Sequence, residues 1–151
     1  MSELITPSLE EAQCYINALD FGQIIHKMVH RDGWLKSDAV QVCELYRGYL
    51  FLRRKYSHLH KLPPSKEIDE VWHYHILDTK KYRKDCLAVF GSYHDHYPYF
   101  GFDDVSDQDT LCEAYQITRT LFLQEFGHPI YQVRNKFSKW VAFIKKRLRR
   151  G

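Results

Sequence analysis

The chain has 151 residues, which suits one domain with a buried hydrophobic core. Its composition, 44% hydrophobic and 27% charged, is globular and excludes an intrinsically disordered protein. The net charge of +3 is too small to indicate nucleic-acid binding by itself, although five of the last seven residues, KKRLRRG, are basic. Only 7 glycines and 5 prolines are present, which argues against a turn-rich all-β fold.

The sequence has no feature of a membrane-spanning or secreted protein. No apolar run approaches the roughly 20 residues of a transmembrane helix. The N-terminal MSELITPSLEEA lacks the basic start and the apolar stretch of a signal peptide. The 4 cysteines form no C-x-x-C pair, which disfavours a four-cysteine zinc site. We therefore expect reduced, mostly buried thiols and a cytoplasmic location.

Helical periodicity and capping residues extend along the whole chain. Ser8 and Glu11 form a capping box at the start of the first segment. Ser37, Ser65 and Asp78 are expected to cap the third, fourth and fifth helices, and Ser106 with Asp109 begins the sixth. The predicted helices cover residues 8–19, 21–29, 37–56, 66–77, 79–90, 106–126 and 135–149. The sequence predicts a single all-α domain, residues 1–151, of six or seven helices.

Residues 91–105 are the exception, because they have no helical period and are rich in Tyr, His, Pro and Gly. Gly91 is suited to end the preceding helix in a left-handed conformation. A loop of this length inside a compact domain is more often functional than not. It carries His94 and His96, two of the four histidines that lie in the windows DEVWHYHILD and SYHDHYPYFG.

The other two histidines, His73 and His75, lie on the 66–77 helix. A helix turns by roughly 100° per residue, so these two side chains point about 160° apart and cannot bind one ion. His75 lies in the middle of an apolar face that includes Trp72. On the next helix, Tyr82 and Cys86 share an inward face. His75 and Cys86 are therefore expected in the core, where they can approach each other.

Asp69 and His73 are the candidate metal ligands of the helix. They are one turn apart, so a carboxylate and an imidazole can converge on one ion. The remaining ligands would come from the loop, from His96 or His94, which point the same way if the loop is extended. Such mixed nitrogen and oxygen ligands suit zinc, iron, manganese or nickel. We expect a divalent ion, zinc or iron.

Structural explanations of the same residues stay open. Asp69 and His73 can be a surface pair, and His75 can be a buried histidine bonded to a backbone carbonyl. His94 and His96 can be solvated loop residues. For Cys86 we expect a structural thiol rather than a nucleophile, because a catalytic thiol needs a base and some exposure. Two further pairs, His26 with His30 and His58 with His60, lack an accompanying carboxylate and are expected to be solvated.

The run P-x-x-E-I-D-E-V-W-H-Y-H-I-L-D-T-x-x-Y-x-x-D-C-x-x-x-F-G (64–91), followed by H-Y-P-Y-F-G (96–101), resembles the glycine-rich domain-containing protein-like family. The resemblance implies that the family signature includes Asp69, Trp72, His73, His75, Tyr82, Cys86 and His96. Among the loop histidines it favours His96. The glycine-rich tail of plant members is absent from this chain, and the resemblance brings no activity with it.

Two functions follow as hypotheses. The first is a metal site formed by the D-x-V-W-H-x-H helix and the histidine loop, with hydrolytic or oxidative chemistry if the protein is an enzyme. The second is a non-catalytic interaction module, in which the His, Cys and aromatic cluster is a structural core and the loop contacts a protein partner. The last helix has an apolar stripe of Phe137, Trp140, Val141, Ile144 and Leu148. We expect this stripe to dock on the core, and the alternative is weak contact with an anionic membrane surface or a nucleic acid.

Overall fold

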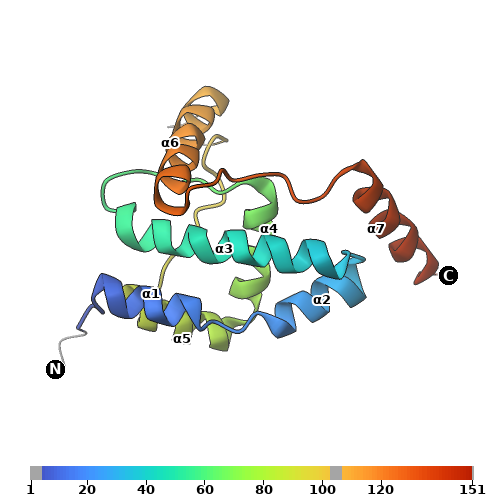
Figure 1. The fold of residues 1–151 in the computed structure, drawn as a ribbon, viewed down its shortest axis with the longest axis horizontal. Helices are drawn as coiled ribbons and strands as arrows, with labels where there is room; N and C mark the ends of the chain where they lie inside the picture. The colour runs from blue at the N-terminus through green and yellow to red at the C-terminus, as the bar shows by residue number, and fades with distance from the viewer. Residues whose placement is uncertain (1–4, 103–106, 151) are drawn as a thin grey trace.

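The computed structural model describes residues 5–102 and 107–150, and within these ranges it contains helices and no strand (Figure 1). The seven helices are α1 Leu9–Asn17, α2 Gly22–Asp32, α3 Lys36–Tyr56, α4 Lys66–Leu77, α5 Thr79–Phe90, α6 Gln108–Phe126 and α7 Lys136–Leu148. This confirms the predicted all-α fold. No helix in the described ranges is long and apolar enough to cross a bilayer.

The longest helix, α3, is the centre of the structure. It packs against α1, α2, α4 and α6, and α5 packs against both α1 and α4. Figure 1 shows α3 running across the middle, with α6 and α7 standing out from the remaining helices. Tyr46, Tyr49 and Leu52 of α3 are fully buried. Because α4 crosses this central helix, one side of α4 faces the core and the other faces solvent.

Capping explains most of the helix ends, with two differences from expectation. Ser65 and Asp78 accept the expected backbone hydrogen bonds at the starts of α4 and α5. α3 begins after Leu35 without a side-chain cap, so the expected cap at Ser37 is wrong. α6 is capped by Asp107, and Ser106 lies outside the described residues.

The segment between α5 and α6 is non-helical over residues 91–102, as predicted, and residues 103–105 of the expected loop lie outside the described part of the chain. Gly91 ends α5 with a φ of 75°, a left-handed conformation that favours glycine. The segment then passes alongside α4, which is how His96 can meet Asp69 and His73 of that helix.

The segment from 127 to 135 connects α6 to α7 and is anchored to the core. The carboxylate of Glu67 accepts backbone hydrogen bonds from Val133 and Arg134, at 2.7 and 3.1 Å. The guanidinium of Arg134 lies over the ring of Trp34, at 3.6 Å from its centroid, and pairs with Glu70 at 2.9 Å. α7 therefore starts from a fixed point, and it packs against α2.

The predicted docking of the α7 stripe is met only in part, because Val141 and Ile144 are half-buried and the other three members of the stripe face solvent. Phe137, Trp140 and Leu148 are 65%, 59% and 77% exposed. The buried residues are instead Ser138 and Ala142. Their small side chains let α7 approach the end of α2, where a Cβ added to Gly33 would lie 2.8 Å from the carbonyl oxygen of Ala142. Close backbone approach, rather than burial of the large side chains, determines how α7 sits.

Candidate metal centre

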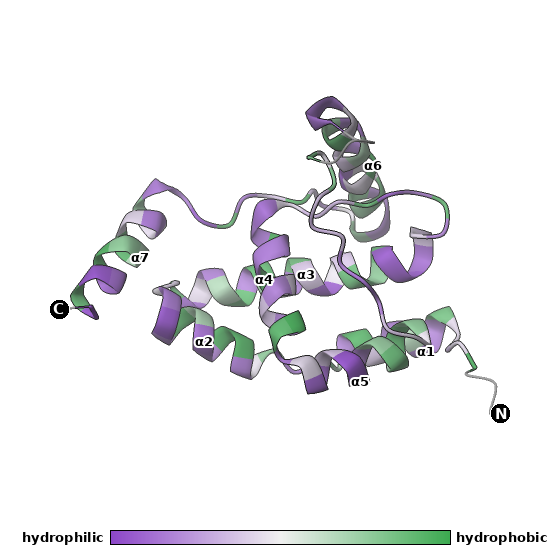
Figure 2. Ribbon diagram, turned by 180° about the vertical axis from the view of Figure 1, so that it is seen from behind, coloured by the Kyte–Doolittle hydropathy of each residue, from purple (hydrophilic) through white to green (hydrophobic). Residues whose placement is uncertain are grey.

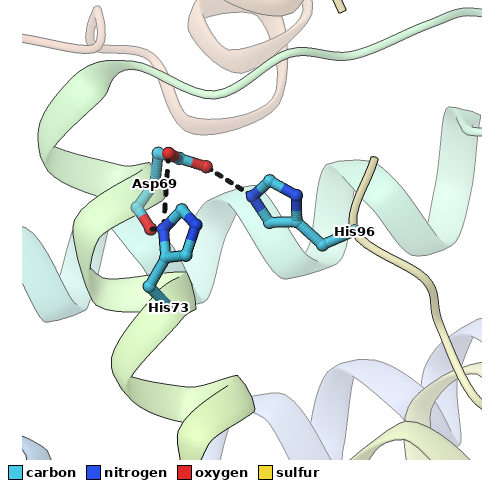
Figure 3. Close-up of side chains that lie close together, drawn as sticks. All are labelled: Asp69, His73 and His96. Carbon is cyan, nitrogen blue, oxygen red and sulfur yellow. Dashed lines mark hydrogen bonds and ion pairs between the residues drawn. The ribbon is translucent and has the colours of Figure 1, made fainter. Parts of the chain in front are cut away.

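Asp69, His73 and His96 converge on one point beside α4 (Figure 3). Asp69 and His73 are one turn apart on α4, and His96 reaches them from the 91–102 segment. His96 Nε2 lies 2.6 Å from Asp69 Oδ1, and His73 Nδ1 lies 3.4 Å from Asp69 Oδ2. Within the described residues, this is the only group of three His, Cys, Asp or Glu side chains that could hold a metal ion.

The spacing of the potential ligand atoms is close to that of a first coordination shell. One ligand atom from each residue lies within 4.8 Å of the others. Two nitrogen or oxygen ligands bound to zinc at about 2.1 Å can be at most about 4.2 Å apart. Side-chain movements of less than about 1 Å would therefore complete a shell. The side chain of His73 is 52% exposed and that of Asp69 34%, so an ion can reach the site from solvent.

His96 is held by an aromatic platform. Its ring centroid lies 4.2 Å from that of Trp72. The indole Nε1 of Trp72 donates a hydrogen bond to the hydroxyl of Tyr82 at 2.9 Å, and this hydroxyl donates to the backbone oxygen of His94 at 2.6 Å. Trp72 and Tyr82, which were expected around the site, thus connect two helices to the loop that carries His96.

His94, the alternative loop ligand, is not part of the triad. Arg53 of α3 donates from Nε to His94 Nε2 at 2.9 Å, which occupies the lone pair that a metal would need. The ring of His94 also stacks on Phe90, with centroids 4.0 Å apart. Burial, and then the charge of Arg53, lower the pKa of His94 to about 3. The sequence did not indicate this, because Arg53 lies on a helix 41 residues away.

His75 belongs to a separate, buried network. Only 1% of the residue is exposed, as expected. Its Nδ1 lies 2.8 Å from the hydroxyl of Tyr46, and its Nε2 lies 2.7 Å from Asp85 Oδ2. The alternative that His75 bonds to a backbone carbonyl is therefore wrong, since both ring nitrogens bond to side chains. In the neutral ring, Nε2–H donates to the carboxylate and Nδ1 accepts from the tyrosine.

Asp85 is the centre of this network and was missed as a candidate. It also accepts hydrogen bonds from the Tyr15 hydroxyl at 2.7 Å and from Lys81 Nζ at 2.9 Å. Burial alone raises the pKa of Asp85, but the hydrogen bonds from His75, Lys81 and Tyr15 outweigh it and lower the pKa to about 2. A signal was present in the sequence, because Asp85 lies three residues after Tyr82 on the inward face of α5.

The cysteines support a structural role for Cys86. All four thiols are free, and Cys86 and Cys43 are buried, whereas Cys14 and Cys112 are exposed. The expectation that the thiols are mostly buried is therefore correct for two of the four. Burial raises the pKa of the Cys86 thiol, which opposes formation of a nucleophilic thiolate.

A cavity of about 660 Å³ opens beside the triad. Asp69 and His96 contribute to its wall, together with Trp72, Phe100 and Arg53. Its volume is within the range of small-molecule sites, which are about 300–1,000 Å³ and mostly apolar. Of the remaining histidine pairs, His60 lines this cavity. The rings of His26 and His30 are 4.2 Å apart and have no third potential ligand in the described part of the chain.

The comparison with curated proteins and with solved structures gives no match. One family model, described as UCP032817-like, matches residues 11–119. The matched range includes the triad, the buried network around Asp85 and the 91–102 segment, and it covers more than half of the chain. The protein therefore belongs to the UCP032817-like family.

Proposed function

We propose that Asp69, His73 and His96 bind a divalent metal ion, zinc or iron. The observation that carries this proposal is the convergence of one carboxylate and two imidazoles from two separate segments, with ligand atoms within 4.8 Å of one another. Two histidines and one carboxylate are the ligands of non-haem iron(II) sites and of several catalytic zinc sites.

The three protein ligands leave coordination positions for water or for a bound molecule. Because Asp69 and His96 also line the 660 Å³ cavity, a small molecule in the cavity would lie next to the ion. A metal in this position can activate water or polarise an oxygen atom of the bound molecule. The chemistry that fits the site is therefore hydrolytic or oxidative, on a substrate small enough for the cavity.

A non-catalytic interaction module is the second candidate, and a different observation favours it. In the absence of a metal, Asp69 already accepts a hydrogen bond from His96, and the Nδ1 of His73 donates to the backbone oxygen of Asp69 at 2.6 Å. The loop nearby also exposes large aromatic side chains, which suit a protein partner: Tyr97, Tyr99 and Phe102. In this case the triad would only fix the loop.

The sequence resemblance supports the same residues. The signature of the glycine-rich domain-containing protein-like family includes all three members of the triad. Under this proposal the chain shares that signature together with the metal site. The four free thiols favour the cytoplasm as the place where the protein acts.

The test is elemental analysis of untagged protein, together with anomalous diffraction at the zinc and iron edges. We expect about one ion per chain in the wild type and less than about a tenth of an ion in His96→Ala. The matched control is the double variant His26→Ala/His30→Ala, which removes another pair of neighbouring histidines and should keep the ion. If the wild-type protein binds neither zinc nor iron on titration, and so behaves like His96→Ala, the metal site is ruled out and the interaction module is the remaining function.

A further inference from the structure

α7 exposes a face that no other described element covers. Its large apolar side chains that are mostly exposed are Phe137 at 65%, Trp140 at 59%, Phe143 at 58% and Leu148 at 77%. At about 100° per residue, Trp140 points directly away from the buried pair Ser138 and Ala142. The contact with α2 therefore turns the apolar side of α7 outward.

The same helix carries a strong positive charge. Seven basic residues lie between positions 136 and 150, with no acidic residue among them: Lys136, Lys139, Lys145, Lys146, Arg147, Arg149 and Arg150. None of them forms an ion pair within the described residues. Elsewhere, by contrast, Arg134 and Lys55 pair with glutamates. The positive charge of α7 is thus available to an external partner.

The position of α7 lets this face meet a flat surface. Figures 1 and 2 show α7 at one extremity of the molecule, beyond α2 and well away from α1, α5 and α6. The contacts of Arg134 with Glu67, Glu70 and Trp34 fix the segment that leads into it. The helix is therefore presented in a defined orientation.

We propose that α7 binds the surface of an anionic lipid membrane, with Trp140 and its apolar neighbours entering the interfacial region. A basic amphipathic helix binds such a surface through buried apolar area and attraction to anionic headgroups together. Nucleic-acid phosphates would satisfy the cations but leave Phe137, Trp140 and Leu148 in water. A second copy is disfavoured, because it would bring two faces of like charge together.

The protein contains its own probe for the test. Of the three tryptophans, Trp34 and Trp72 are 1% and 3% exposed, whereas Trp140 is 59% exposed and is the one that can enter a membrane surface. Adding vesicles of phosphatidylcholine with about one third phosphatidylserine should shift the emission of Trp140 to shorter wavelength and sediment the protein. Vesicles of phosphatidylcholine alone should do neither, because binding requires anionic lipid.

Two variants separate the contribution of the apolar side chains to membrane binding from that of the positive charges. Trp140→Ser should abolish the emission shift and weaken sedimentation at least 10-fold, since it removes the central apolar group. Lys136→Gln/Lys139→Gln/Lys146→Gln should weaken sedimentation about 100-fold while keeping Trp140. The matched control, Lys80→Gln/Arg83→Gln/Lys84→Gln, removes three exposed charges from α5 and should bind like the wild type apart from a small loss of overall charge.

Other outcomes would overturn the proposal. Equal binding by wild type and Trp140→Ser would show that only general electrostatic attraction acts. Tighter binding to duplex DNA or RNA than to anionic vesicles, unaffected by Trp140→Ser, would assign the charge to nucleic acid. A concentration-dependent dimer that Trp140→Ser dissociates, measured by analytical ultracentrifugation without lipid, would assign the face to a second copy. Metal binding at Asp69 plays no part in these measurements.

Discussion

The two histidines of the W-H-Y-H run are separated by one residue and lie in opposite environments. His73 points to solvent, 52% of its side chain is exposed, and its neighbours are Asp69 and His96. His75 points into the core and has both ring nitrogens bonded, to Tyr46 and Asp85. The same side chain on the same helix is thus a potential ligand at one position and a structural element at the other.

The surroundings of His75 and His73 differ in how many of their polar atoms have hydrogen-bond partners within the protein. The network of His75 gives both of its ring nitrogens a partner, and the side chains of His75 and Asp85 are only 1% and 5% exposed, so loss of either member leaves a buried group short of a hydrogen bond. The triad is partly solvated, and water can replace a lost partner there. We therefore expect stability to depend on the buried network and ion binding to depend on the triad, and each prediction below tests this separation.

The largest effect is expected from His75→Ala. Removing a hydrogen-bond donor from a buried carboxylate costs about 3 kcal/mol or more, and the cavity left by the ring adds to this, while the Tyr46 hydroxyl also loses its partner. Urea unfolding followed by circular dichroism measures this cost. Protein that remains folded at low temperature should still bind one zinc ion. A loss of zinc by folded His75→Ala would show that the two regions are not separate.

The next effect is stabilisation by zinc. A free zinc concentration of 100 times the dissociation constant should raise the free energy of unfolding of the wild type by about 2.7 kcal/mol. His26→Ala/His30→Ala should behave in the same way, whereas His96→Ala should gain nothing. Unfolding curves with and without zinc give the comparison, and equal gains in all three proteins would place the ion elsewhere.

Asp85 predicts how stability depends on pH. Its folded-state pKa of about 2 lies below the unfolded value of about 3.9. The stabilisation is therefore fully present above about pH 4 and is lost as the pH falls from 4 towards 2. The loss should be about 2 kcal/mol. Asp85→Asn, unlike the exposed control Asp109→Asn, should be less stable at pH 7 and lose less on acidification. An identical pH profile for wild type and Asp85→Asn would contradict this assignment.

The smallest effect is expected from His73→Ala in metal-free protein. Exposed ion pairs contribute about 0–1 kcal/mol, so its free energy of unfolding should change by less than about 0.5 kcal/mol. The same variant should nevertheless lose the ion. A destabilisation comparable with that of His75→Ala would mean that the triad, too, is a structural core.

The sequence predicted the parts of the structure that depend on local pattern. The bounds of α4 and α5 follow from Ser65, Asp78 and Gly91, and the opposed directions of His73 and His75 follow from helical rotation alone. The proximity of Asp69, His73 and His96 was also expected, from a one-turn spacing and a loop rich in histidine.

What the sequence did not predict depends on contacts between distant segments. Arg53 binds His94 and so keeps it out of the triad. Tyr15 and Tyr46, from two other helices, complete the network around Asp85 and His75. The apolar stripe correctly predicted that residues of α7 form a helix. It could not indicate that Ser138 and Ala142 would form the contact with α2. Small side chains contribute little to a hydrophobicity pattern, although they allow two helices to approach each other most closely.

Gly33 lies at the contact between α2 and α7. It ends α2 with a φ of 76°, and the space where its side chain would be is filled by the backbone of α7 at Ala142. A substitution such as Gly33→Ala would strain the end of one helix and displace the other at the same time. α7 would then lose its closest contact with α2 and keep residues 127–135 and the hydrogen bond from Arg149 to the Val29 carbonyl oxygen as its attachments. The direction of the Trp140 face thus depends on the absence of a single methyl group in another helix.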